Sequence, residues 1–540
     1  MASGGERIGN LGHGGRQGLR EAIGAGTARG GGGLGFALLL TLYLLAFVAL
    51  AAHAPDEIWN PQARPFVLLV GWIAAWRYGW GAVHLARSWW FRGVVFPRRR
   101  RLLARIQASD AGAALAAPEV FIVITSFRIP AETTIAAFTA AFAEAARYPG
   151  TASVVAAVVE PADVRLVKQL HRALPQGQGV RLILARERGS GKRDGLAVAL
   201  RAVARRAPPP GSVVLLQDGD AVLPPGCLDA TVPLFRLLPW VAAMTTDEDC
   251  VVPEAGPVLR AWHRLRFAQR HVLMSSLALS GRLITLTGRM SLYRAEIATH
   301  PSFIAAIQHD SLDHWRLGRL RLLTGEDKSA AWWLLRRGLA TLYVPDVQVL
   351  TVELPPAPDL LRASTRLMLR WFGNMLRASG RGIALGPGRI GWFTWWCLVD
   401  QRISMWTPLI GPIATALLAA TVSPVFLYAY LLWAMGTRLL QSLALLTARP
   451  TISGLYPPLL YFSQVYGALI KTWVLFRLDR QRWTRQNIAL APRLRPAQAA
   501  SRALSSLGLH LLALAALATA VAFATWVLPP PSAATFAAIR

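Results

Sequence analysis

Apolar runs of membrane length lie on both sides of a long polar stretch, and this arrangement limits the folds open to the chain. The runs 35–52 and 65–85 precede the polar stretch, and each is near the roughly 20 residues that a helix needs to cross a bilayer. Four more runs follow it, at 390–420, 425–446, 455–476 and 504–528. With 54% hydrophobic residues among 540, the chain is too apolar for an ordinary soluble enzyme and too long for one domain. We therefore expect a membrane protein with a sizeable polar domain.

Arginines indicate which side of the membrane the polar stretch faces. They crowd the outer flanks of the first two apolar runs, in the Gly-rich tail 1–33 and in the run 98–101, whereas the loop between the two runs carries few charges. The positive-inside rule then makes 34–86 a pair of transmembrane helices and places the tail and the polar stretch in the cytosol. The tail itself is too poor in apolar residues to order, so we expect it to be flexible.

A second Arg-rich segment, 477–486, constrains the number of membrane crossings after the polar stretch. For that segment to be cytosolic an even number of crossings must precede it, yet three apolar runs do. We expect 455–476 to be interfacial or re-entrant, and 390–405 to be interfacial as well. The region 385–476 would then mix interfacial and transmembrane helices, 477–500 would be cytosolic and 504–528 would be a last transmembrane helix, for five or six spans in all.

The charge balance suggests the chemistry of the partners. Lys and Arg number 58 against 29 Asp and Glu, and the net charge of +29 favours anionic lipid headgroups, nucleotide-diphosphate substrates or a polyanionic product. Nucleic acid is the alternative for so basic a chain, but the sequence has no zinc spacing and no RNA-binding signature, so we do not expect it as a partner. The three cysteines form no CxxC pair and leave an odd count, which indicates neither a disulfide framework nor a zinc site.

The polar region, 102–384, alternates short β-branched runs with Ala-rich stretches of helical character. The runs predicted to be strands are 119–125, 152–159, 180–185 and 212–217. Strands that alternate with helices favour an α/β fold with a mostly parallel, Rossmann-like sheet. The crevice at the carboxyl ends of its strands should then hold a nucleotide ligand.

Two aspartates follow the last of these strands. Asp218 and Asp220 stand on either side of Gly219, and residues i and i+2 of an extended segment face the same way, so both carboxylates can approach one hard cation. Mg²⁺ or Mn²⁺ typically takes one or two carboxylates and leaves its other positions to substrate phosphates. An Asp-Gly turn at a strand end is the alternative interpretation.

A Gly-rich segment, 189–195, precedes another candidate site. It fits neither the dinucleotide-binding pattern nor the P-loop pattern. Lys192 and Arg193 nevertheless open a predicted helix, where a donor phosphate would meet positive charge and free backbone N–H groups. A solvated helix start is the alternative.

Four motifs follow one another along the chain: DGD at 218–220, TGRMSLYR at 287–294, GEDK at 325–328 and RW at 370–371. Their order resembles the processive family 2 glycosyltransferases, the group of cellulose, chitin and hyaluronan synthases, from about residue 119 to residue 485. The resemblance implies a GT-A-like cytosolic glycosyltransferase domain at 102–384, inserted between α-helical transmembrane segments.

The resemblance also implies catalytic roles. The carboxylate of Asp327, with Glu326 beside it, would deprotonate the acceptor hydroxyl, and Arg370 and Trp371 would clamp the diphosphate and the acceptor sugar. The chain departs from the family at Leu367, where the family has Gln.

Other positions receive binding roles by the same resemblance. Gly288 and Arg289 would lie along the acceptor and polymer, and Glu160, after the second strand, would contact the nucleotide. Trp483-Thr484-Arg485 resembles the family's gating loop without its Gly, which would put both Trp483 and Arg485 over the nucleotide. Arg485 would then contact the donor, and Trp483 would contact the polymer.

Two further charged groups lack a clear assignment. The cluster TTDED at 245–249 would add to the cation or donor site, or else form a solvated loop. Asp400 and Arg402 lie in an apolar stretch, where unpaired charge is costly, so we expect them to pair with each other or to line the sugar path.

Longer strings, among them TSFRIPAETT, GEDKSAAWWLL and FRLDRQRWTRQ, resemble the mannuronan synthases of bacterial alginate synthesis. That resemblance implies GDP-mannuronate as donor, a β-1,4-linked polymannuronate that crosses the bacterial inner membrane as product, and a cyclic-di-GMP-binding co-polymerase as partner. Another β-glycan synthase that uses a UDP-sugar, a non-processive transferase to a lipid carrier and a non-catalytic transporter or scaffold are the alternatives.

Overall fold

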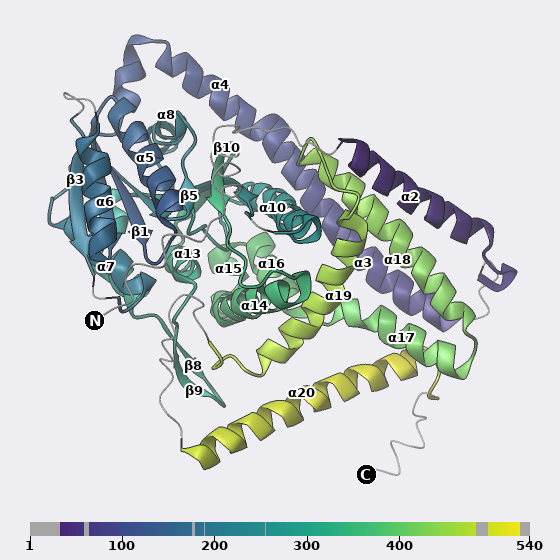
Figure 1. Ribbon diagram of the computed structural model, residues 1–540. Helices are drawn as coiled ribbons and strands as arrows, with labels where there is room; N and C mark the ends of the chain where they lie inside the picture. Colours follow the sequence, from purple (N-terminus) through teal and green to yellow (C-terminus); the bar gives the residue numbers. More distant parts are fainter. Residues whose placement is uncertain are drawn as a thin grey trace, which may run out of the picture.

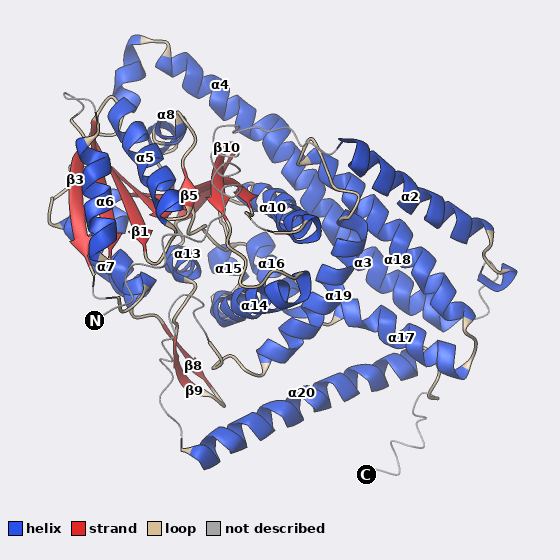
Figure 2. Ribbon diagram, viewed as in Figure 1, coloured by secondary structure: helices blue, strands red, loops and turns tan. Residues whose placement is uncertain are grey.

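The computed structural model describes residues 33–58, 64–174, 179–187, 189–253, 255–481 and 495–529. A sheet with its covering helices forms one side of the molecule, and long apolar helices form the other (Figures 1 and 2). The predicted α/β fold, inserted between apolar helical segments, is confirmed.

The sheet has eight strands in the order β3-β2-β1-β4-β7-β6-β10-β5. Its strands are β1 (Glu119–Ser126), β2 (Thr151–Val158), β3 (Arg181–Arg186), β4 (Val213–Asp218), β5 (Ala221–Val222), β6 (Val241–Val251), β7 (Met290–Arg294) and β10 (Ala340–Val352). The four predicted strands are β1 to β4, and they pair in parallel. Strand β7 runs antiparallel to β4 and β6, and β5 antiparallel to β10, so the sheet is mixed rather than parallel throughout.

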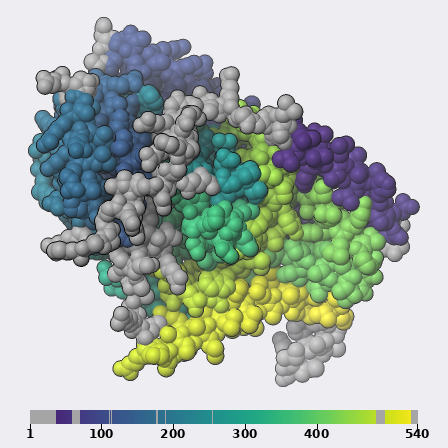
Figure 3. All heavy atoms as spheres, in the orientation of Figure 1, coloured from purple at the N-terminus to yellow at the C-terminus, as the bar shows by residue number. Residues whose placement is uncertain are grey.

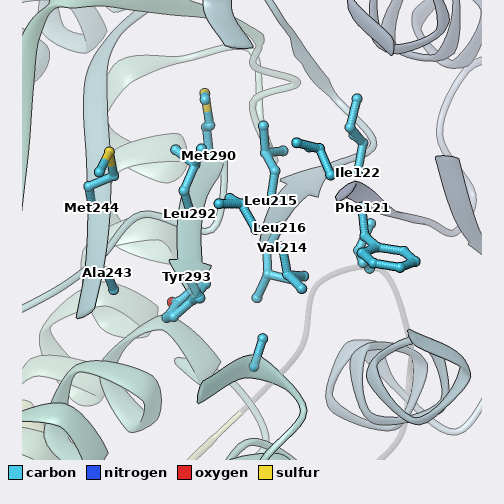
Figure 4. Packing of buried hydrophobic residues seen from close by; sticks show 14 of the residues in the cluster. Phe121, Ile122, Val214, Leu215, Leu216, Ala243, Met244, Met290, Leu292 and Tyr293 are labelled. Carbon is cyan, nitrogen blue, oxygen red and sulfur yellow. The ribbon is translucent and has the colours of Figure 1, made fainter. Parts of the chain in front are cut away.

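Helices cover both faces of the parallel half. Helices α5 (Ala131–Arg147) and α6 (Pro161–Arg172) lead outward from β1 to β3, and α7 (Lys192–Ala204) leads back to β4. Because such crossovers are right-handed, α7 lies on the opposite face from α5 and α6. The strands are consequently buried on both faces and carry almost only apolar side chains. Figure 4 shows this core, in which side chains of β1, β4, β7 and β6 pack side by side.

Two helices stand between the sheet and the apolar helices: α10 (Pro257–Ala278) and α14 (Leu360–Ala384) (Figure 1). Their apolar faces share one core with α19 (Tyr456–Leu475). The smaller elements are α8 (Cys227–Thr231), α9 (Pro233–Leu237), α11 (Ala295–Ala298), α12 (Pro301–Gln308), α13 (Glu326–Arg336), α15 (Pro387–Ile390), and the hairpin β8 (Ser311–His314) and β9 (Gly318–Arg321).

Most of the remaining helices form the apolar side: α2 (Gly33–Ala52), α3 (Arg64–Trp90), α16 (Trp392–Ile403), α17 (Thr407–Thr421), α18 (Val425–Ala444) and α20 (Pro496–Ala524). Helix α4 (Phe96–Gln107) is rich in arginine and packs Phe96 and Leu103 into the core of the sheet domain. A π-helical turn, Phe91–Val95, joins α3 to α4. Helices α2 and α20 lie on the surface (Figure 3) and expose large apolar side chains such as Leu45 and Leu504, as lipid-facing helices do.

Three segments of the described residues are long and apolar enough to cross a membrane: Trp392–Thr421, Val425–Thr447 and Pro496–Ala524. The part Ala37–Ala52 of α2 is a shorter apolar stretch. Helix α3, predicted as a crossing, is not among the three and carries Arg77 and Arg87. These segments fit a membrane protein. The domain limits, the span count and the interfacial assignments stay predictions.

Candidate active site

The carboxyl ends of the parallel strands meet at one edge of the sheet. Thr125 pairs in register with Asp218 across β1 and β4, and Glu160 is the exposed residue that precedes α6 at the end of β2. Ligands of open α/β sheets bind outside this edge. Local sequence therefore places Asp218 where a nucleotide is expected.

The DGD segment turns rather than continuing as a strand. Strand β4 ends at Asp218, and Gly219 and Asp220 form a turn, so the predicted alternation of an extended segment is wrong here. A Cβ at position 219 would lie 2.8 Å from the Thr125 carbonyl oxygen, which explains the glycine. The two carboxylates still act on each other, because burial raises the pKa of Asp218 to about 6 and the charge of Asp220 adds to the rise.

Lys192 joins two of the predicted motifs. Its Nζ lies 2.5 Å from Asp218 Oδ1 and also pairs with Glu326 Oε1. Burial would raise the pKa of Glu326, but the charges of Lys192 and Arg193 lower it to about 2. At neutral pH, Glu326 is therefore an ionised partner of Lys192.

A small pocket collects these groups. It is lined by Thr125, Lys192, Asp218, Gly288, Glu326 and Asp327, among others. A Cβ at Gly288 would lie 2.9 Å from Lys192 Nζ and 3.0 Å from Asp218 Oδ2, so the backbone approaches the charges as closely as only glycine allows. Gly288, predicted along the acceptor, therefore lies beside the DGD and GEDK acids.

Asp327 differs from its neighbour Glu326. The Thr285 hydroxyl donates a hydrogen bond of 3.0 Å to Asp327 Oδ2, and among the described residues this carboxylate has no ion-pair partner. Both acids lie in the first turn of α13. A carboxylate without a contact ion pair is better suited to accept a proton than Glu326 is.

Helix α14 holds the loop before α13. Gly325 has φ +82°, and its Cα faces Asn374, since an added Cβ would lie 3.0 Å from Asn374 Cγ. The Thr324 hydroxyl donates to Asn374 Oδ1 at 2.8 Å, and the Arg377 guanidinium donates to the same oxygen at 2.7 Å. The RW and GEDK motifs are thus connected through a shared helix and loop.

Trp371 lies on α14 one turn before Asn374, with Arg370 adjacent. The Trp371 ring stacks on Trp262 of α10 with centroids 6.0 Å apart, and the Arg266 guanidinium carbon lies 3.4 Å from the Trp371 ring centroid. A protein cation therefore already covers part of the indole that was predicted to face a sugar. Trp483 and Arg485 lie outside the described residues.

The structure gives other predicted residues different partners. Arg193 is buried and donates to the carbonyls of Ile307 (2.6 Å) and Thr324 (3.0 Å), so it connects α12 to the loop before α13 rather than facing a phosphate. Arg289, predicted along the polymer, pairs with Glu248 (3.1 Å) and Glu353.

The acidic cluster and the membrane-side charges also differ from expectation. Asp247 receives two hydrogen bonds from Arg449, of 2.8 and 2.9 Å, and Glu248 pairs with Arg289, so these two buried acids of β6 are neutralised by arginines and do not form a solvated loop. Asp400 pairs with Arg77, whereas Arg402 donates to Ser379 and to the Leu376 carbonyl, so the predicted Asp400–Arg402 pair is wrong.

The acids present suit a cation that is shared with a substrate. Among the described residues no group of three or more His, Cys, Asp and Glu side chains is arranged to hold a metal ion. Two carboxylates at the strand end match the usual coordination of Mg²⁺, which binds one or two carboxylates together with phosphate oxygens and water. Asp218 and Asp220 are the residues that would hold it.

Sequence reasoning missed Thr285 and Asn374. Both are neutral, and neither belongs to a pattern that signals chemistry. Asn374 lies within the string RWFGNMLR, which marks the region without indicating a role. Their contacts with the GEDK acids and loop could be found only from the packing of α14 and the 279–289 loop against α13.

The sequence of the chain is similar to that of known glycosyltransferases. Residues 117–374 match the family model described as "Glycosyltransferase like family 2". A protein named Glycosyltransferase alg8 from Pseudomonas syringae pv. tomato is 43% identical over 449 residues, which are 83% of this chain and 90% of that protein. One of the same name from Azotobacter vinelandii is 42% identical over 479 residues, 87% of this chain and 92% of the relative.

Among solved structures, the mannosyltransferase PcManGT from Pyrobaculum calidifontis, in complex with GDP-Man and Mn²⁺, is 17% identical and covers 72% of this chain and 97% of its own. Its TM-score of 0.37 is too low to support an argument about this chain.

Proposed function

This chain belongs to glycosyltransferase family 2, and from that premise we propose that it polymerises mannuronate from GDP-mannuronate into β-1,4-linked polymannuronate and passes the polymer across a bacterial inner membrane. The relatives named Glycosyltransferase alg8 support the alginate-type activity, because their likeness extends over most of the chain. The basic excess suits a product with a carboxylate on every sugar.

One observation carries the proposal. Asp218, Lys192, Glu326 and Asp327, from three separate sequence segments, line the same pocket at the carboxyl edge of the sheet. A nucleotide-sugar donor would bind there with its diphosphate near Asp218 and Asp220, and a bound Mg²⁺ or Mn²⁺ would neutralise the charge of the leaving group. Lys192 supplies a cation in the same pocket, and Glu160 at the sheet edge would contact the nucleotide.

The chemical step needs a base. A sugar hydroxyl is a poor nucleophile at neutral pH, and Asp327, which accepts a hydrogen bond from the neutral Thr285, is the carboxylate proposed to take its proton. Direct attack on the anomeric carbon displaces the diphosphate once, so the reaction inverts the configuration. Arg370 and Trp371 would hold the diphosphate and acceptor, and Trp483 and Arg485 would close over the nucleotide.

Three further parts of the proposal rest on the sequence alone. The resemblance to mannuronan synthases implies a cyclic-di-GMP-binding co-polymerase as partner, the basic excess favours contact with membrane lipids, and the positive-inside rule favours a cytosolic catalytic domain. A β-glycan synthase that uses a UDP-sugar and a non-processive transferase to a lipid carrier are the competing functions.

The test is to incubate membranes that contain the chain with GDP-mannuronate or, separately, with UDP-sugars, and to size the products. We expect a polymer from GDP-mannuronate that a mannuronate-specific lyase degrades, and none from membranes that contain an Asp327→Asn variant. A polymer made only from a UDP-sugar would replace the donor, and a single sugar on a lipid would exclude processive synthesis.

A further inference from the structure

Arg266 is a cation placed over the indole of Trp371. Its guanidinium carbon lies 3.4 Å from the Trp371 ring centroid and 5.0 Å from that of Trp262. All three side chains lie where α10 meets α14. Figure 1 shows these two helices between the sheet and α19. Contact with a ring face offsets part of the cost of burying a guanidinium and keeps its donor edge oriented.

The acids nearest to Arg266 are engaged elsewhere. Arg289 pairs with both Glu248 and Glu353, and Arg270 lies 3.5 Å from Glu248. Among the described residues Arg266 itself makes no ion pair and no hydrogen bond. Burial lowers the pKa of Arg266 to about 9, and the charge of Glu353 opposes this without a contact between the two side chains. Three arginines therefore share two glutamates, and Arg266 is the one of the three that forms no ion pair among the described residues.

The position of Arg266 connects it with the catalytic loop. Trp371 precedes Asn374 by three residues, about 4.5 Å along the axis of α14, and Asn374 contacts the loop that carries Glu326 and Asp327. On α10, Arg270 follows Arg266 by one turn on the same face. Burial lowers the pKa of Lys328, Asp327 opposes this and Arg270 adds to it, so the charge of Arg270 acts on the first turn of α13.

We propose that Arg266 binds the carboxylate of the sugar unit at the acceptor end of the growing polymer, and thereby selects a uronate over a neutral sugar. The proposal rests on the proposed function, because it takes the acceptor to be a polyuronate. A partly buried guanidinium with no hydrogen-bonded anion is costly, and a planar carboxylate matches the guanidinium fork while the sugar ring lies beside Trp371. Trp371 alone provides a surface for a sugar ring and does not distinguish a uronate from a neutral hexose.

The experiment uses the full-length protein in lipid nanodiscs, labelled GDP-mannuronate as donor, and β-1,4-mannuronate oligomers or their carboxyl-reduced counterparts of equal length as acceptors. For Arg266→Gln we expect the KM for mannuronate oligomers to rise about 10-fold or more, the usual worth of a hydrogen bond to a charged group, with a smaller change in kcat. The KM for carboxyl-reduced oligomers should change little.

Matched variants separate binding from folding. Arg264→Gln removes an exposed charge from the same helix and should leave both KM values unchanged. Arg266→Lys keeps the charge without the fork and should fall between Arg266→Gln and the wild type. Arg266→Met keeps an apolar stem on Trp371 and supplies the same measurement if Arg266→Gln fails to insert.

Each other outcome overturns the inference. An equal rise of both KM values would make Arg266 only a packing contact between α10 and α14. Weaker GDP binding by calorimetry in Arg266→Gln would assign it to the donor diphosphate. If the wild type polymerises mannuronate and Arg266→Gln leaves both KM values unchanged, the role of Arg266 alone is refuted. If the wild type makes no polymer from GDP-mannuronate, the proposed function is refuted.

Discussion

A single methyl group at Gly288 should disable the site without unfolding the protein. In Gly288→Ala the added Cβ would lie 2.9 Å from Lys192 Nζ, 3.0 Å from Asp218 Oδ2 and 3.4 Å from Glu326 Oε1. Ordinary contacts of a methyl carbon begin near the last of these distances, so Lys192 and Asp218 must each move by a few tenths of an ångström. Gly288 does not have a positive φ, so alanine adds no backbone strain.

The expected loss of activity follows from the displacement of Lys192. Displacement of Lys192 weakens the charge-assisted hydrogen bond that we propose it makes to the donor diphosphate, worth about 1.5–3 kcal/mol, which corresponds to a fall in kcat/KM of roughly 10- to 100-fold. The free energy of unfolding should change little, because the far end of the lysine is flexible and can move. Alanine also lowers the conformational entropy of the unfolded chain, which stabilises the fold by about 0.4–1 kcal/mol. The contrast between activity and stability is the diagnostic feature.

The assay measures initial rates of sugar transfer in nanodiscs together with the thermal unfolding midpoint. Gly195→Ala is the matched control: it lies three residues after Lys192, and nothing lies within 4 Å of the Cβ it would add. That variant should keep its activity. A Gly288→Ala enzyme within about two-fold of the wild-type rate, or one whose stability falls in step with its activity, would refute the reasoning.

Further predictions address the base, the cation and the pH dependence of stability. Asp327→Asn keeps the shape of the side chain but removes the proton acceptor, so kcat should fall by roughly 10²- to 10⁴-fold while GDP binding by calorimetry stays within a few-fold; near-normal turnover would move the base elsewhere. EDTA should abolish transfer and Mg²⁺ or Mn²⁺ should restore it if Asp218 holds a cation with the donor, and full activity in excess chelator would remove the metal from the proposal. Burial would raise the pKa of Glu353, but Arg289 lowers it to about 2. Its stabilisation is therefore complete above the ordinary carboxyl pKa and is lost as the pH falls from about 4.5 toward 2, so chemical denaturation should show a loss over that window that Glu353→Gln reduces.

Much of the fold could be predicted from local patterns. The β-branched runs that form β1 to β4 and the apolar runs that form the long helices are properties of neighbouring residues, and burial on one or both faces of an element requires them. The motifs could be found in the sequence for the same reason, because each adjoins one local element: DGD begins at the last residue of β4, and α13 begins within GEDK. The antiparallel strand β7 was not expected, because its partners β4 and β6 are distant in sequence.

The partners of the charges were decided only by the tertiary structure. Lys192 and Arg193 are adjacent and equally basic, yet the first reaches Asp218 and Glu326 while the second is buried among carbonyl groups. Successive helical residues point about 100° apart, and what each one meets depends on how α7 packs against α12 and α13. In the same way, Arg266 is one of several arginines on α10, and only the packing of α14 against that helix places Trp371 beneath it. Sequence determined which residues carry chemistry, and long-range packing determined which charges neutralise one another and which remain available to a ligand.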